Sequence, residues 1–321
     1  MRYKKLSNLD KMASPIVTGT FMGQMIEGED ASEILDQILN AGINFFDTAK
    51  AYASCEISLG KWLEKGDNRE KAIVLTKGCH HDLDPYKKRV TPECFREDIV
   101  SSLERLRTDY IDIYLLHRDD PEVPVGPLME VFDEYHRKGI IKVCGVSNWT
   151  VERIEEANQY AKEHGLVQLT VSEPNYSLCE QMGDPWGHGC LTITGKAEEH
   201  SRKWYMENQM PVLSYSSLGR GFLSGLVKSD DPDGAMGLLD EAGIKGYCYP
   251  ENFKRLERVE QLAKEKNVTV SQIALAWIMN QKLDAYPIVT CDSPEHIQNT
   301  LGALEVRLTE HEVNWLDLRE D

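Results

Sequence analysis

Short apolar segments alternate with amphipathic helical segments along the whole chain, and this alternation restricts the fold more than any other feature. The segments predicted as strands are 15–18, 44–48, 72–77, 111–117, 142–147, 167–172, 211–215 and 285–290. Between two of them, Phe95, Ile99, Leu103 and Leu106 recur at the spacing that places apolar side chains on one helical face. A repeated strand–helix–strand pattern predicts a parallel sheet whose strands are joined by helical crossovers.

Other helices are predicted from the same spacing. They cover residues 34–39, 131–138 and 151–164, and a glycine follows each of them, at Gly42, Gly139 and Gly165. Glycine is common directly after a helix because it adopts the left-handed conformation without strain. A further helix is predicted around Ile273, Ala276 and Trp277, with Ser271 as its first residue.

Eight predicted strands in 321 residues fit one closed (β/α)8 barrel. We therefore expect a single barrel domain over residues 1–321. A doubly wound sheet with a second domain is the alternative, but no G-x-G-x-x-G motif follows an early strand. Two long connections, 178–199 and 229–252, follow predicted strands. On a barrel, both are expected to be loops over the carboxyl-terminal face, where barrel active sites lie.

The charge of the chain argues against polyanionic partners. It has 36 basic and 53 acidic residues and a net charge of −17, which repels nucleic acid and anionic lipid. We expect neither nucleic acid nor a membrane as a partner. No apolar run is long enough to cross a bilayer, and the first residues lack the apolar stretch of a secretory signal. A cytoplasmic location is therefore expected.

No metal site is expected. The eight cysteines are scattered and include no C-x-x-C pair, which is typical of reduced thiols. His80 and His81 are adjacent, and adjacent residues on a loop rarely both bind one metal ion. We expect them to be surface histidines. The charged residues 118–120 are expected to lie partly at the rim of the barrel and partly in solvent.

Single polar groups stand at the ends of the predicted strands. They are Asp47 with Tyr52 just beyond it, Lys77, His117, Ser147 with Asn148, Glu173, and Tyr215. Packing alone does not require these groups, and charges in a barrel mouth are costly unless paired. We interpret Tyr52 as a proton donor whose pKa is lowered by Lys77, with Asp47 holding Lys77 and His117 orienting a carbonyl. Each group alone has a structural explanation, but the four together favour catalysis.

The segments around these groups form a recognisable set. They are NFFDTA at 44–49 followed by Tyr52, IVLTK at 73–77, YIDIYLLH at 110–117, GVSNW at 145–149 and YSSLGRG at 215–221. This set resembles the aldo-keto reductase family, over nearly the whole chain. The loop at 184–191 also looks like one in bacterial relatives tied to sugar catabolism. The resemblance implies hydride transfer between NAD(P)H and a carbonyl or secondary alcohol without a metal, with catalytic residues Asp47, Tyr52, Lys77 and His117.

The resemblance also implies a binding site for the nicotinamide dinucleotide. The implied cofactor residues are Gly19, Thr20, Phe21, Asp47, Ser147, Asn148, Glu173, Tyr215, Ser216, Leu218, Gly219, Arg220, Thr290, Asp292, His296 and Thr300. Ser147 and Asn148 would hold the carboxamide, and Tyr215 would stack on the nicotinamide ring. Glu173 stands where the family usually has glutamine, and we keep it as a carboxamide contact. The substrate would contact Tyr52, His117, Trp149, Trp186 and Tyr249.

One departure from the family pattern bears on the choice of cofactor. Asp292 stands where relatives often carry a basic residue that binds the 2′-phosphate of NADP. Ser293 and Pro294 still read as the cap and first turn of a helix, whose N-terminus favours anions. A carboxylate repels a 2′-phosphate but accepts a hydrogen bond from the ribose hydroxyl of NAD. We therefore hypothesise a preference for NAD(H) over NADP(H).

The substrate is less constrained than the reaction. Aromatic residues combined with polar groups such as Arg118 suit a sugar or sugar-derived carbonyl. A cofactor-binding regulatory or sensor subunit with weak catalysis is an alternative, although the complete set of four catalytic residues favours turnover. A metal-dependent barrel hydrolase or aldolase would need a cluster of ligands that the strand ends do not offer. The sequence leaves open the substrate, the direction of reaction and the oligomeric state.

Overall fold

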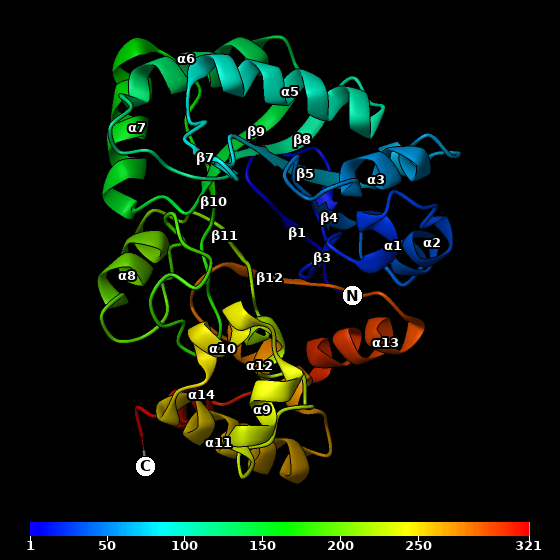
Figure 1. The fold of residues 1–321 in the computed structure, drawn as a ribbon, viewed down its shortest axis with the longest axis vertical. Helices are drawn as coiled ribbons and strands as arrows, with labels where there is room; N and C mark the ends of the chain where they lie inside the picture. The colour runs from blue at the N-terminus through cyan, green and yellow to red at the C-terminus, as the bar shows by residue number, and fades with distance from the viewer. Residues whose placement is uncertain (321) are drawn as a thin grey trace. The chain divides into compact units, whose positions relative to one another are not determined.

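A computed structural model describes residues 1–320, and its helices and strands are drawn in Figure 1. Eight parallel strands form a closed barrel. The barrel strands are β3 (Val17–Gly19), β4 (Phe45–Asp47), β5 (Ile73–Gly78), β8 (Ile111–Leu116), β9 (Ile141–Ser147), β10 (Val171–Glu173), β11 (Val212–Ser214) and β12 (Ala285–Val289). Their order around the barrel follows the chain, from β3 to β12. The predicted fold class is therefore confirmed.

The contacts of the chain divide it into two compact units. The first unit holds residues 1–173 with 290–292, and the second holds residues 174–289 with the chain from Ser293 on. The first contains β3, β4, β5, β8, β9 and β10, and the second contains β11 and β12. The expectation of a single domain over residues 1–321 stays a prediction.

Helices follow the barrel strands in both units. The first unit contains α1 (Gly23–Ile26), α2 (Ser32–Asn40), α3 (Cys55–Leu63), α4 (Asn68–Lys71), α5 (Pro92–Leu106), α6 (Val125–Arg137) and α7 (Val151–His164). The second contains α8 (Glu199–Glu207), α9 (Pro232–Leu238), α10 (Glu241–Tyr247), α11 (Pro250–Lys266), α12 (Val270–Met279), α13 (Pro294–Gly302) and α14 (Glu310–Leu316). Two antiparallel hairpins, β1 (Lys4–Lys5) with β2 (Met12–Ala13) and β6 (Asp82–Leu83) with β7 (Tyr86–Lys87), lie outside the barrel.

The strands of the first unit are mainly apolar and almost entirely buried. Every residue of β4, β5 and β8 is buried, as expected for parallel strands that are enclosed on both sides. Gly145 allows close contact between β9 and β10, because a Cβ atom there would lie 2.4 Å from the carbonyl oxygen of Val171. A side chain at this position would push apart two strands that carry site residues at their ends.

One strand begins later than the sequence predicts. The pattern predicts a strand over 167–172, but β10 covers only Val171–Glu173. The backbone N–H of Val167 donates to Asp133 Oδ1 at 3.0 Å, and that of Leu169 donates to Asn158 Oδ1 at 2.7 Å. Side chains on α6 and α7 therefore take the hydrogen bonds that a longer strand would need.

The sequence predicts a loop over the segment 229–252, and this prediction is wrong because helices α9 and α10 lie within it. Asp231 and Asp240 accept hydrogen bonds from the N–H groups of Gly234 and Gly243, and so cap the two helices. The segment 178–199 is a loop, as predicted, until α8 begins at Glu199. Helix α12 starts earlier than predicted: Thr269 is its N-cap, and Ser271 already lies inside the helix.

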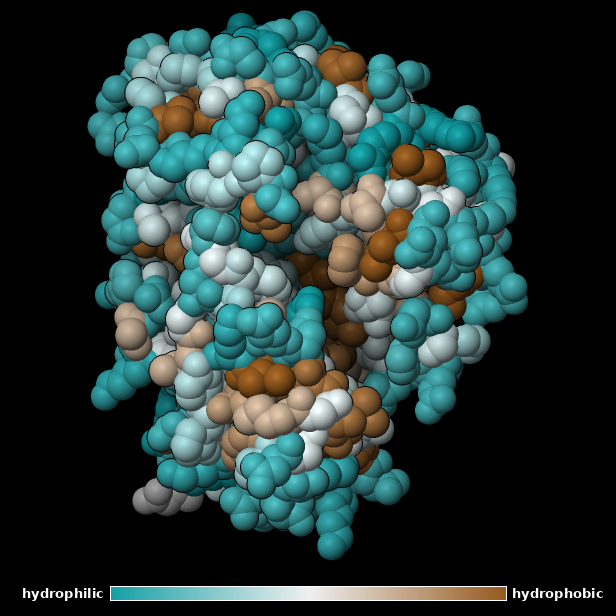
Figure 2. All heavy atoms as spheres, viewed as in Figure 1, coloured by the Kyte–Doolittle hydropathy of each residue, from teal (hydrophilic) through white to brown (hydrophobic). Residues whose placement is uncertain are grey.

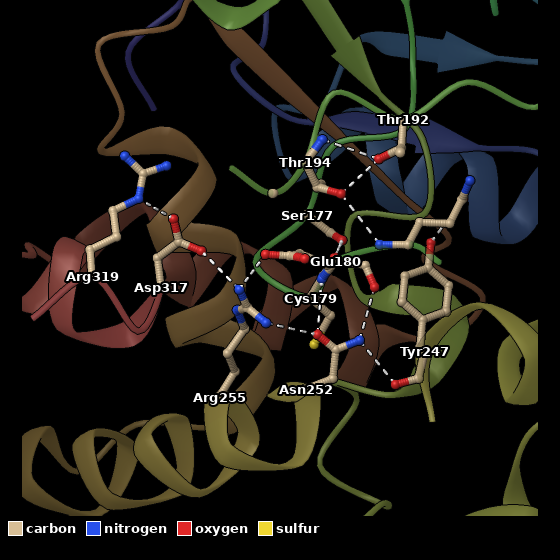
Figure 3. Close-up of polar contacts among 12 residues, drawn as sticks. Ser177, Cys179, Glu180, Thr192, Thr194, Tyr247, Asn252, Arg255, Asp317 and Arg319 are labelled. Carbon is tan, nitrogen blue, oxygen red and sulfur yellow. Dashed lines mark hydrogen bonds and ion pairs between the residues drawn. The ribbon is translucent and has the colours of Figure 1, made fainter. Parts of the chain in front are cut away.

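A buried arginine links three segments of the second unit (Figure 3). Arg255 on α11 donates to Glu180 Oε1 at 2.6 Å and lies 3.5 Å from Asp317 Oδ1. It also donates to Asn252 Oδ1 at 3.3 Å, and Asn252 in turn donates to the carbonyl oxygen of Glu180. These contacts connect the loop at 178–199 to α11 and to the residue that follows α14.

The face of the molecule drawn in Figure 2 is mainly hydrophilic, with hydrophobic residues in scattered groups. This pattern agrees with a chain in which 28% of the residues are charged. Among the helices of residues 1–320, none has the length and apolar character needed to span a membrane.

Candidate active site

The candidate site of the first unit lies at the carboxyl ends of its parallel strands. Asp47 ends β4, Lys77 is the next-to-last residue of β5, and Glu173 ends β10. His117 directly follows β8. All four residues are buried. Since the strands are parallel and in register, their polar ends meet at one edge, as the sequence predicts.

Lys77 stands at the centre of this group. Its side chain is 0% exposed, and its ammonium bonds to Asp47 Oδ1 and lies 3.0 Å from Glu173 Oε1. Burial by itself lowers the pKa of an ammonium, but the charges of Asp47 and Glu173 outweigh this effect and raise the pKa of Lys77 above its usual value. Lys77 is therefore positively charged at neutral pH.

Glu173 makes a contact that the sequence does not reveal. Its carboxyl group bonds to the Lys77 ammonium, so two acidic side chains contact one cation. Burial, together with the nearby charge of Asp47, raises the pKa of Glu173 to about 8. Burial also raises the pKa of Asp47, against the attraction of Lys77. A contact between Glu173 and a carboxamide stays a prediction, whereas its ion pair with Lys77 is an interaction that sequence reasoning missed.

Tyr52 lies in the turn between β4 and α3, beside these charges. The Lys77 ammonium is 5.3 Å from the centre of the Tyr52 ring, and the His117 ring meets it edge-on at 5.6 Å. Burial of the hydroxyl raises the pKa of Tyr52 above 10, and the charge of Lys77 opposes that rise. The expected effect of Lys77 on this pKa is thus correct in sign, but the expectation of a net decrease is wrong because burial is the larger effect.

His117 is a neutral imidazole in this site. Burial lowers its pKa far below 6.5, and the nearby His80, Lys77 and Arg118 lower it further. The His117 backbone N–H donates to the carbonyl oxygen of Gly78 at 2.8 Å, which fixes the start of the loop after β8. A neutral imidazole can donate one hydrogen bond to a carbonyl oxygen without adding charge to the site.

The prediction that His80 and His81 lie on the surface is wrong. His81 is 4% exposed, and the His80 ring packs edge-on against His117, with 4.7 Å between ring centres. Burial and the charge of Arg118 lower the pKa of His80 to about 4. The sequence contains a signal for a place near the site, because His80 lies two residues after the end of β5, the strand that carries Lys77.

The prediction for residues 118–120 is also wrong, since Arg118 and Asp120 are both buried. Trp149 is 1% exposed, and its indole N–H donates to the carbonyl oxygen of Arg118 at 3.2 Å. The guanidinium of Arg153 covers the Trp149 ring at 5.1 Å. This burial argues against direct contact between Trp149 and a substrate, and indicates that Trp149 supports the loop that holds Arg118.

Ser147 and Asn148 tie neighbouring strand ends together. Ser147 Oγ donates to the carbonyl oxygen of Glu173 at 2.8 Å, and Asn148 Nδ2 donates to that of His117 at 3.2 Å. Asn148 has a φ of 61°, in the left-handed region, which asparagine tolerates better than most residues. Both side chains are buried close to Glu173 and His117, where the resemblance places the nicotinamide carboxamide.

The residues after β3 border Tyr52. Gly19 and Thr20 are buried, and the backbone N–H of Thr20 donates to the carbonyl oxygen of Asp47 at 2.9 Å. Phe21 is 50% exposed, and its ring meets Tyr52 edge-on with 5.3 Å between centres. The Phe21 ring is thus an apolar surface beside the phenol.

The second unit brings together an aromatic and cationic group from two segments. Tyr215 and Trp186 meet edge-on at 6.0 Å, and the guanidinium of Arg220 lies 5.5 Å from the centre of the Trp186 ring. Arg220 also forms an ion pair with Asp240. Of the residues between Tyr215 and Arg220, Ser216 and Leu218 are half-buried and Gly219 is buried. Elsewhere in this unit, the Tyr249 hydroxyl donates to the carbonyl oxygen of Lys245 at 2.5 Å.

The residues around the start of α13 differ in exposure. Thr290, Asp292 and His296 are exposed, whereas Thr300 is buried, which disfavours direct contact of Thr300 with a dinucleotide. Ser293 accepts a hydrogen bond from the His296 backbone N–H at 3.2 Å. The predicted cap of this helix is therefore confirmed.

A closed (β/α)8 barrel with buried polar groups at its strand ends has the architecture of a barrel enzyme. Comparison with known proteins defines the family. The model of the aldo/keto reductase family matches residues 15–318, so the chain belongs to this family. With its relatives, this membership identifies the chain as an NAD(P)H-dependent reductase.

Curated relatives are similar along most of their length. Aldo-keto reductase str7 of Strobilurus tenacellus is 26% identical, over 91% of this chain and 82% of the relative. Norsolorinic acid reductase B of Dothistroma septosporum is 27% identical, over 90% and 71%. Probable aldo-keto reductase 1 of Glycine max is 29% identical, over 95% and 81%.

A solved structure shows the same fold. The thermostable aldo-keto reductase Tm1743, crystallised with the inhibitor epalrestat, has a TM-score of 0.73 and 23% sequence identity. The match covers 100% of both chains, so the barrel and its order of elements are shared throughout.

Proposed function

We propose that the chain reduces a carbonyl compound at the strand ends of its first unit, with Tyr52 as the proton donor. The observation that supports this proposal most strongly is the placement of a buried, doubly paired Lys77 5.3 Å from the Tyr52 ring. A neutral His117 packs edge-on against the same ring, with 5.6 Å between ring centres. This set combines a proton donor, a positive charge that stabilises its conjugate base, and a neutral hydrogen-bond donor.

Each residue has a distinct part in the proposed reaction. The bound nicotinamide supplies the hydride that reaches the carbonyl carbon. As negative charge develops on the carbonyl oxygen, the proton of the Tyr52 hydroxyl moves to that oxygen, and His117 donates a hydrogen bond to it. Lys77 stabilises the phenolate left on Tyr52. Asp47 and Glu173 hold the Lys77 ammonium in place, because together they outweigh the cost of burying it.

The residues present suit a dinucleotide. Tyr215 offers an aromatic face, and the capped N-terminus of α13 favours an anion. For the choice between NAD(H) and NADP(H), we propose NAD(H). Asp292 and Glu295 are both exposed at the start of this helix, and two carboxylates there oppose a 2′-phosphate. Asp292 can instead accept the ribose hydroxyl.

A sugar or sugar-derived carbonyl remains the proposed substrate class. The pairing of Trp186 with Tyr215 and the nearby Arg220 combines aromatic surface with charge, which suits polyhydroxylated ligands. One of the curated relatives is named norsolorinic acid reductase B, and the other names reported above give no substrate.

Substitution of the phenol tests the proposed function. Tyr52→Phe is expected to reduce kcat at least about 10³-fold, since general acid catalysis commonly contributes 10²–10⁴-fold and no other hydroxyl replaces this proton. Cofactor affinity should stay within about threefold, because the ring is retained. Steady-state kinetics with an aldehyde panel and fluorescence titration with NADH measure the two quantities. Turnover close to that of the unmodified protein would refute the role of Tyr52.

The choice of cofactor is tested by reversing one charge. The unmodified chain is expected to have a higher kcat/KM for NADH than for NADPH. Asp292→Arg should raise kcat/KM for NADPH at least about tenfold, because a guanidinium binds phosphate in place of a repelling carboxylate. Glu257→Arg makes the same charge change at an exposed position of α11 and serves as the control. A tenfold advantage for NADPH in the unmodified chain would contradict the proposal.

A further inference from the structure

Arg118 is a buried cation without a protein counter-ion. It is 8% exposed, and no carboxylate of residues 1–320 lies within 4.0 Å of its guanidinium. Its Nε has no hydrogen-bond partner. The other buried arginines differ: Arg153, Arg202 and Arg255 all bond to carboxylates or carbonyl oxygens. A buried charge without a partner is costly, so its retention points to a ligand.

The position of Arg118 places this charge beside the reacting groups. Arg118 follows His117 directly, and its charge acts on Tyr52, His80 and His117. The indole N–H of Trp149 donates to the carbonyl oxygen of Arg118 and so holds its backbone. Both histidines are neutral at pH 7, and Asp47 balances the charge of Lys77. Glu173 also touches Lys77, but burial raises its pKa to about 8, so it is mainly protonated and neutral at pH 7. The unbalanced positive charge at this edge of the site is therefore that of Arg118.

We propose that Arg118 binds an anionic oxygen group, a carboxylate or a phosphate ester, on the substrate whose carbonyl is reduced. This inference rests on the proposed function and narrows the substrate class from sugar-derived carbonyls to acidic ones, such as an aldehyde acid or a sugar phosphate. A guanidinium offers two parallel N–H groups to such an anion. The anchored anion would fix the distance of the carbonyl from Tyr52 and His117, because Arg118 directly follows His117 and the backbone of both residues is hydrogen-bonded.

Matched pairs of substrates test this inference. The pairs are 4-carboxybenzaldehyde with its methyl ester, and glyceraldehyde 3-phosphate with glyceraldehyde. In each pair the carbonyl is the same and only the anion differs, so the two arms distinguish a carboxylate from a phosphate. The ratio of kcat/KM for the anionic member to that for the neutral member is expected to exceed about tenfold in at least one pair. Arg118→Met should lower that ratio at least about tenfold, to a value close to one, because nothing then favours the anion.

The control substitution keeps the charge. Arg118→Lys should lower the same ratio only about threefold, because an ammonium retains the attraction but loses the paired geometry. If Arg118→Met does not fold, the lysine variant and the substrate preference of the unmodified chain decide the question. A ratio in Arg118→Met within about threefold of the original would overturn the inference, as would an unmodified chain without preference for either anion.

Two further outcomes are informative. If Arg118→Met raises KM for the cofactor and leaves the substrate ratio unchanged, the guanidinium serves the cofactor and the inference is wrong. If the unmodified chain reduces none of the four carbonyls with NADH or NADPH, the proposed function itself fails. Reduction of the neutral aldehydes alone leaves the proposed function in place and contradicts only the role of Arg118.

Discussion

Glu173 changes the charge balance around Lys77. With Glu173 protonated, Asp47 alone pairs with the ammonium, and the Lys77–Asp47 pair is neutral. With Glu173 ionised, a second negative charge faces the same ammonium, and this charge makes ionisation of Tyr52 more difficult. Because burial and Asp47 raise the pKa of Glu173 to about 8, the two states exchange close to neutral pH.

The pH dependence of reduction should therefore show the ionisation of Glu173. Below about pH 8, Glu173 holds its proton and Tyr52 is the better acid, so kcat/KM should be high. As the pH rises through about 8, the new charge should weaken Tyr52 as a donor and kcat/KM should fall. Glu173→Gln keeps the shape but cannot ionise, and its kcat/KM should be flat across this range. The measurement is the pH profile of kcat/KM for both proteins at saturating cofactor.

Two results would contradict the role of Glu173 in this pH profile. An inflection near pH 8 that persists in Glu173→Gln would assign the ionisation to another group. A loss of activity at all pH values without a change in profile would indicate that Glu173 only supports the structure.

The sequence predicts much of the site at this scale, because a polar residue at the end of an apolar strand is visible in the chain. It predicts the placement of Asp47, Lys77 and His117 at one edge. It does not predict the Glu173–Lys77 pair, whose members are 96 residues apart on β10 and β5, two strands that are not neighbours in the barrel. Nor does it predict the burial of Arg118, which depends on the packing of Trp149.

At the scale of elements, the predicted boundaries hold where a single local signal decides them. Helix α7 covers Val151–His164 as predicted and ends at Gly165, whose φ is 65°. The start of β10 and the helices within 229–252 are missed. The start of β10 depends on hydrogen bonds between the backbone before it and side chains that are distant in sequence. For the helices within 229–252 the sequence offers one signal, the Asp231–Pro232 cap, but the many small residues of the segment favour a loop.

The link through Arg255 joins three elements of the second unit and should contribute strongly to stability (Figure 3). Arg255→Met is expected to lower the free energy of unfolding by about 2–3 kcal/mol, because it leaves Asp317 with fewer partners in a buried place. Asp317 keeps its ion pair with Arg319 at 2.6 Å, which limits the loss. The midpoint and slope of urea unfolding measure the change.

The matched control removes an exposed ion pair of the same unit. Lys203→Met on α8 breaks the pair with Glu207, whose atoms are 3.7 Å apart and whose side chains are largely in solvent. It should leave the unfolding midpoint unchanged, since such pairs contribute little. Equal effects of the two substitutions would show that Arg255 contributes no more than a surface residue.

At the scale of the whole molecule, the alternation of strands and helices was sufficient to predict the closed barrel. Eight parallel strands, buried on both faces, need covering helices, and the sequence shows both periods directly. The division into two compact units is not visible in the sequence, because it depends on the number of contacts between distant segments. Net charge, at −17, concerns partners and solubility and carries no information about the barrel.

The enclosure of Lys77 has a practical consequence for chemical treatment of the protein. Lysines such as Lys203 and Lys245 are exposed and will react with formaldehyde and a borane reductant, a treatment that aids crystallisation by methylating surface amines. The amine of Lys77 has no exposed surface and is held as an ammonium between Asp47 and Glu173, so it lacks both access and a free electron pair. Methylation of the surface amines is therefore expected to leave the amine of Lys77 unaltered.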